Sequence, residues 1–136
     1  MKYDLLFHVN ANDPEVFKIA FGQAANYKRE ANRKRQLSAL DIATKAAMGA
    51  LEVEQGFRLV MVVNGPAVRQ LLKDNTELQE FAEKAVNNGL KIHAGQYALE
   101  AGKITKDDLW SFVEIVPSAT LEIVQLQNEG FAYIKV

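Results

Sequence analysis

The chain has 136 residues, 49% of them hydrophobic, so it fits one domain large enough to bury a core of its own. It contains no cysteine and two histidines, which excludes disulfides, a persulfide, thiolate catalysis and any metal centre held by cysteine. A formal net charge of −1 and an N-terminus without an apolar leader favour a cytoplasmic protein that binds neither nucleic acid nor membrane and carries no cofactor or metal.

The first half of the chain predicts a strand, two helices and a second strand. Residues 2–9 are apolar and β-favouring, and Asp13 then caps a helix whose apolar residues recur every three or four positions. Ser38 begins a capping box, which predicts a separate second helix that runs up to Gly56. Residues 57–63 are almost continuously apolar, as in a strand that is covered on both faces.

The second half alternates helices with strands, each marked by a cap or an apolar run. The predicted strands are residues 90–94, 112–116 and 131–136. The predicted helices begin near Pro66, Thr76, Gln96, Thr105 and Ser118. Strands and helices joined by short loops imply right-handed crossovers. We therefore predict a single α/β domain over residues 1–136, a three-layer sandwich with a mainly parallel five-stranded sheet.

Four sequence motifs follow one another from Asn64 onward. They are N-G-P-A-V-R-Q-L-L, N-G-L-K-I-H-A-G-Q-Y-A-L, I-T-K-D-D-L, and V-P-S-A-T-L-E-I-V-Q-L-Q-N-E-G-F-A-Y-I. In this order and at these distances the chain resembles the DsrE/DsrF-like family. The resemblance covers the second half well and the first strand and helix loosely, and it is weakest over residues 35–54.

This resemblance implies a flavodoxin-like DsrE fold that assembles into homo-oligomers, with a trimer or a hexamer favoured. Some members of the family carry sulfur as a cysteine persulfide, and the carrier cysteine follows the third strand. Gly95 occupies that position here, so the sulfur-carrier function does not transfer to this chain. Cysteine-free members of the family are sister subunits of sulfur-relay complexes or stand-alone proteins, which adds a related subunit as an alternative partner.

The carboxyl ends of parallel strands meet at one edge of a sheet, where ligands of such folds bind. Helices that begin at this edge favour a small anionic or polar ligand there. The predicted ligand-binding residues are His8, Asn10, Asn64, Gly65, His93, Gly95, Gln96 and Tyr97, with Asn12 and Ser118 beside them. The two glycines fit either a close backbone approach to a ligand or a simple turn, and the turn is favoured.

The two histidines leave the catalytic question open. His8 and His93 are candidate acid and base catalysts because imidazole titrates near neutrality, although histidines in strands are more often structural. Alternation along the strand leaves open whether His93 faces the cleft or a helix interface. The leading hypothesis is a non-catalytic oligomeric protein that binds a small ligand. The alternatives are a subunit of a sulfur-relay hetero-oligomer and a small enzyme that uses His8 or His93 with Tyr97.

Two further features bear on partners. The segment Lys28–Arg35 holds five basic residues and one acidic residue, which fits a solvated helix end or, less readily, a patch for an anionic partner. Several small or aromatic residues fit either a contact with another subunit or the core, and these are Ala43, Ala47, Ala50, Phe131 and Tyr133.

Overall fold

The computed structural model describes residues 2–47 and 56–136, with the backbone alone for residues 37–47. Five parallel strands form one sheet in the order β4-β3-β2-β1-β5. The strands are β1 (Leu5–Val9), β2 (Leu59–Val63), β3 (Leu90–Gly95), β4 (Val113–Val116) and β5 (Ala132–Lys135). The helices are α1 (Pro14–Ala47), α2 (Thr76–Asn87), α3 (Gln96–Ala101) and α4 (Ala119–Asn128), with short 3-10 helices η1 (Gly65–Leu71) and η2 (Lys106–Asp108).

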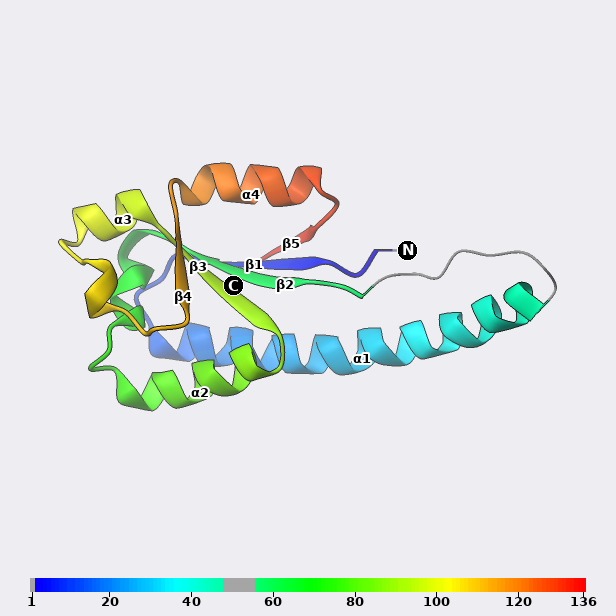
Figure 1. Ribbon diagram of the computed structural model, residues 1–136. Helices are drawn as coiled ribbons and strands as arrows, with labels where there is room; N and C mark the ends of the chain where they lie inside the picture. The colour runs from blue at the N-terminus through cyan, green and yellow to red at the C-terminus, as the bar shows by residue number, and fades with distance from the viewer. Residues whose placement is uncertain (1, 48–55) are drawn as a thin grey trace.

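The helices lie on both faces of the sheet, which confirms the predicted three-layer α/β fold. Figure 1 shows α1 and α2 side by side below the sheet and α4 above it. Within the described residues, none of the helices combines the length and the apolar composition that crossing a membrane requires.

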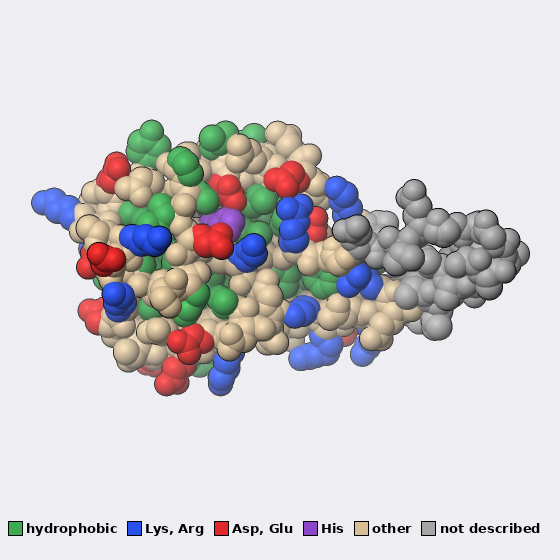
Figure 2. Space-filling model, in the orientation of Figure 1, with side chains coloured by type: hydrophobic (Ala, Val, Ile, Leu, Met, Phe, Trp, Pro, Cys, Tyr) green, Lys and Arg blue, Asp and Glu red, His purple; other side chains and the backbone are tan. Residues whose placement is uncertain are grey.

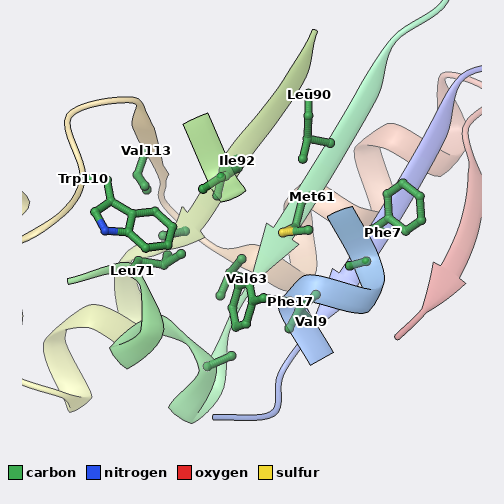
Figure 3. Close-up of a cluster of buried hydrophobic side chains, with 14 of the residues drawn as sticks. Phe7, Val9, Phe17, Met61, Val63, Leu71, Leu90, Ile92, Trp110 and Val113 are labelled. Carbon is green, nitrogen blue, oxygen red and sulfur yellow. The ribbon is translucent and has the colours of Figure 1, made fainter. Parts of the chain in front are cut away.

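The main core lies between the sheet and the pair α1 and α2. Alternate residues of β1 point into it, so Phe7 and Val9 share this core with Phe17 of α1, Met61 of β2 and Ile92 of β3 (Figure 3). Trp110 belongs to the same core on the side of β4, and it is 1% exposed. A smaller cluster on the opposite face packs α4 onto the sheet, and it consists of Leu6, Val60, Val62, Ala119, Leu126 and Phe131.

Helix α1 is longer than predicted because it does not break. The capping box and new helix expected at Ser38 are wrong, since α1 continues through that residue to Ala47. Residues 28–47 contain neither proline nor glycine and are rich in alanine, lysine and arginine, which sustain a helix. The basic segment Lys28–Arg35 therefore lies in the middle of α1, so its interpretation as a helix end is also wrong.

The cap predicted at Thr76 is wrong, the cap predicted at Thr105 is confirmed, and Ser118 begins the helix predicted there. Asn75 is the cap residue of α2, and Thr76 is the first residue of that helix, so the capping box predicted at Thr76 is wrong. Thr105 and Asp108 do form a capping box, but it closes only η2 and not an amphipathic helix. The hydroxyl of Ser118 accepts the Leu121 N–H at 3.2 Å, which makes it the cap of α4 as predicted.

Candidate functional site

The sheet reverses its direction of growth at β1. The chain steps from β1 to β2, β3 and β4 on one side, and then crosses back so that β5 pairs with the other side of β1. In open α/β sheets, ligands bind outside the carboxyl ends of the strands at such a reversal. The carboxyl ends of β1 and β5 are therefore the place where the fold itself favours a site.

Both histidines lie on the sheet face that α4 covers. His8 of β1 is in register with Val62 of β2, and Val62 is in register with His93 of β3. Residues that stand opposite one another in neighbouring strands share a face, and Val62 belongs to the cluster packed against α4. Val62 thus separates the two histidines, and each has its own set of partners.

His8 links two polar side chains from different strands. Its Nε2 lies 2.8 Å from the Oδ1 of Asn64, which follows β2, and its Nδ1 lies 2.6 Å from the hydroxyl of Tyr133 in β5. An amide oxygen only accepts, so with this amide orientation Nε2 carries the hydrogen and Nδ1 accepts from Tyr133. Tyr133 thus donates to His8, and His8 donates to Asn64. We call these three hydrogen-bonded side chains the His8 chain.

The His8 chain is open to solvent and keeps unused polar groups. The side chain of Tyr133 is 39% exposed. Asn64 uses its Oδ1 for His8, and within the described residues its amide nitrogen makes no hydrogen bond and remains able to donate to a ligand. Lys135, the β5 residue in register with His8, adds an exposed cation at the same strand end, and its Nζ donates one hydrogen bond to the carbonyl oxygen of Val136 at 2.9 Å.

His93 is held between two carboxylates instead of facing the strand ends. Its Nδ1 lies 2.8 Å from Oε1 of Glu122 in α4. Its Nε2 lies 3.0 Å from Oε2 of Glu114 in β4, a close contact without hydrogen-bond geometry. The ring is 12% exposed, so His93 ties α4 to the sheet and offers neither nitrogen to a ligand.

The two predicted glycines have different roles. Gly65 has φ +57, a left-handed conformation that L side chains rarely adopt, so the turn after β2 explains it. Gly95 has φ −76, so no turn requires a glycine there. A Cβ at Gly95 would lie 2.9 Å from the Cβ of Ala119 and 3.1 Å from its nitrogen. The favoured turn interpretation is therefore wrong for Gly95, because the close approach of α4 is what excludes a side chain there.

The remaining predicted residues do not join the His8 chain. Gln96 donates to Glu100 at 3.0 Å along α3, and Tyr97 is 73% exposed. Asn10 is exposed at the end of β1, and Asn12 accepts from Gln70 at 2.8 Å. Of the predicted residues, the structure thus brings His8 and Asn64 together and leaves the others separate.

Sequence reasoning missed three residues that matter at these centres. Tyr133 was expected in the core or at a subunit contact, and Glu114 and Glu122 were not singled out. The motif E-G-F-A-Y-I placed Tyr133 in the last strand, but only the pairing of β5 with β1 brings it to His8. The glutamates reach His93 through the seating of α4 and the pairing of β4 with β3.

The contact of Gly95 with α4 yields a stability prediction. Gly95→Ala should lower the free energy of unfolding by about 1–3 kcal/mol, because the new methyl group overpacks a contact made partly by backbone. Ala119→Gly removes the nearest atom and should recover part of this loss in the double variant. Urea denaturation measures all three variants.

The matched control is Gly22→Ala in α1, where an added Cβ meets nothing within 4 Å. This substitution should raise stability by about 1 kcal/mol, since alanine is the better helix former. If Gly95→Ala were as stable as the wild type, α4 would not lie as close to β3 as described.

Comparison with known proteins agrees with the fold and confirms the family that the sequence resembles. The model of the DsrE/DsrF-like family matches residues 20–136. An uncharacterized protein of Aquifex aeolicus is 26% identical, and the match covers 70% of this chain and 47% of that protein, so the chain spans about half of its length. The structure of MTH1491, a protein of unknown function from Methanobacterium thermoautotrophicum, superposes with a TM-score of 0.75 over 99% of this chain and 100% of that one. That pair is 21% identical, so the likeness concerns the fold alone. Because the family model spans most of the sequence, the chain belongs to the DsrE/DsrF-like family.

Proposed function

We propose that this protein is a non-catalytic DsrE/DsrF-like protein that binds a small polar or anionic ligand at the carboxyl end of β1 and assembles as a homo-oligomer. The His8 chain is the observation that carries the proposal. It gathers a phenol, an imidazole and an amide from three strands at the reversal of the sheet.

The unused groups around the His8 chain define the ligand. The amide nitrogen of Asn64 supplies two hydrogen-bond donors. The exposed ammonium of Lys135 supplies a positive charge at the same edge and keeps two N–H donors beyond its hydrogen bond to Val136. Tyr133 keeps lone pairs that accept from a polar ligand. This combination suits a small anion, such as a carboxylate or a phosphate, better than an apolar molecule.

The carrier position supports the non-catalytic part of the proposal. The chain has no cysteine, and Gly95 stands where the carrier cysteine of the family is expected. The first turn of α4 occupies the space that a side chain at this position would need. A persulfide therefore has neither a cysteine sulfur to form on nor space for a side chain at this position.

Exposed apolar side chains support self-association. Tyr97 of α3 is 73% exposed, and Leu121 and Val124 of α4 are 53% and 48% exposed. Figure 2 shows hydrophobic side chains along the upper margin of the molecule, over α3 and α4. A second copy of the chain would remove these side chains from water.

The contacts first expected between subunits contribute less to this proposal. Phe131 is 5% exposed and belongs to the core under α4, so of its two expected places the structure shows the core. The alanine stripe of Ala43, Ala47 and Ala50 lies outside the side chains that the structure describes.

The short contact between Tyr133 and His8 also favours a second candidate function, a small enzyme that moves protons. A hydroxyl 2.6 Å from Nδ1 is within the reach that proton transfer needs. Tyr133 then replaces Tyr97 as the expected partner, and His93 has no part because both of its nitrogens face carboxylates.

Asn64→Asp tests the binding site with little change in shape. The aspartate keeps an oxygen for His8 but loses the amide donors and adds a negative charge, so it should weaken binding of inorganic phosphate by about tenfold or more. Phosphate titration followed by the NMR signals of the His8 ring measures this. Asn128→Asp adds the same charge at the exposed end of α4, at the opposite edge of the sheet, and should change binding much less. A His8 signal that phosphate does not move, or equal binding in Asn64→Asp and wild type, contradicts the proposed site.

Binding and catalysis are separated by an activity screen of the wild type beside His8→Ala and Tyr133→Phe. As a binding protein, the wild type should show no turnover that depends on either residue. A turnover that falls by about 10²–10⁴-fold in both variants would establish the enzyme instead, since that is the usual contribution of a general acid or base.

Leu121→Glu tests the assembly. Light scattering should give a trimer or a hexamer for the wild type and a smaller species for the variant, because a buried unpaired carboxylate opposes association. Thr120→Glu, beside it on α4 and also exposed, is the matched control and should disturb assembly less. A monomeric wild type would contradict the proposal, and a related subunit captured from the native host in its place would indicate a hetero-oligomer.

A further inference from the structure

A pocket of about 240 Å³ lies between α1 and the end of α2. It opens above the first residues of two strands, Leu59 of β2 and Leu90 of β3. The pocket is therefore at the amino edge of the sheet, opposite to the His8 chain. Nothing in the proposed function uses it.

The floor of the pocket is apolar and well packed. Phe21 is 6% exposed, Leu59 is 5% exposed and Leu90 is 2% exposed. Small residues along the two helices leave the space open above this floor, and these are Ala24, Ala25 and Ala85. A ligand held here would bury an apolar body against the floor.

The rim of the pocket is cationic and amidic. Lys28, Arg29, Asn32 and Asn88 line it, and none of the acidic side chains in the described part of the chain does. The ammonium of Lys28 donates to the carbonyl oxygen of Asn88 at the end of α2. This contact fixes one positive charge at the mouth and offsets the partial negative charge of the helix end.

Arg29 is the cation that remains available to a ligand. Its side chain has one long contact within the described residues, 3.5 Å from Nη1 to Oδ1 of Asn26. By contrast, Arg33 in the same basic segment is paired with Glu30 at 3.4 Å and does not line the pocket. Figure 2 shows Lys and Arg side chains gathered along α1 where it passes beyond α2.

From the apolar floor and the cationic rim we propose that this pocket is a second ligand site, one that takes a small carboxylic acid with an apolar body. The guanidinium of Arg29 binds the carboxylate, for which its paired donors are suited, and the apolar body lies over Phe21, Leu59 and Leu90. The volume is below the usual range for drug-sized ligands, which limits the body to a short chain or a single ring. Two cations of the basic segment Lys28–Arg35, Lys28 and Arg29, thereby gain a role in ligand binding in place of the helix-end interpretation.

Titration calorimetry with sodium octanoate tests the proposal, with neutral octanamide as the matched probe. The wild type should bind octanoate saturably and octanamide about tenfold more weakly, because a charge-assisted hydrogen bond is lost. Arg29→Gln should weaken octanoate binding about tenfold or more, whereas Arg33→Gln should leave it nearly unchanged. Ala25→Phe should fill the pocket and abolish binding, and circular dichroism checks that each variant is folded.

The site of binding is read from the NMR methyl signals of Leu59 and Leu90, which octanoate should shift in the wild type. Shifts at His8 instead would assign the anion to the carboxyl edge and overturn this inference without affecting the other site. The inference is also overturned if octanoate does not saturate, if octanamide binds equally well, or if Arg29→Gln and Arg33→Gln behave alike. Should Ala25→Phe fail to fold, the comparison of the two arginine variants decides.

Discussion

The close contact between Gly95 and the first turn of α4 is the constraint on which the packing of this face of the sheet depends. Because Gly95 has no side chain, Ala119 packs against the end of β3 in the space that a Cβ at residue 95 would occupy. This seat brings Glu122 to His93 and presses Leu126 onto the sheet. The same helix closes the position at which sulfur-carrying members of the family are expected to hold their cysteine. One glycine thus changes both the packing and the chemistry that is available.

Helix α4 covers His93 on one side of Val62. On the other side, where the sheet reverses its direction of growth, His8 and its partners stay accessible to solvent. The pairing of β5 with β1 places Tyr133 beside His8, and the turn after β2 adds Asn64. The two histidines therefore have opposite characters on one face, since His93 is locked between carboxylates and His8 is exposed through its partners. The His8 chain therefore lies two strands away from Gly95, the position at which the resemblance to the family places a carrier cysteine.

The sequence predicted most of the strands and helices correctly, but it predicted few of the side-chain contacts between them. Apolar runs and caps located all five strands and the helix that starts at Gln96, because these signals are local. The break at Ser38 failed because a capping pattern alone does not end a helix that lacks glycine and proline. His8 and Asn64 were predictable as neighbours, since both follow apolar strands that end at one edge. Tyr133 and Glu122 were not, because their contacts depend on strand order and on the depth at which α4 sits.

The central claim is that α4 is seated permanently on Gly95, and native-state hydrogen exchange tests it in the unmodified protein. If the claim is right, the amides of Ile123 to Leu126 in α4 exchange only through an opening as costly as that of β2 and β3, which is global unfolding. If those amides exchange through a much cheaper local opening while the strands stay protected, α4 lifts from the sheet. The carrier position would then be accessible, and the account would be contradicted.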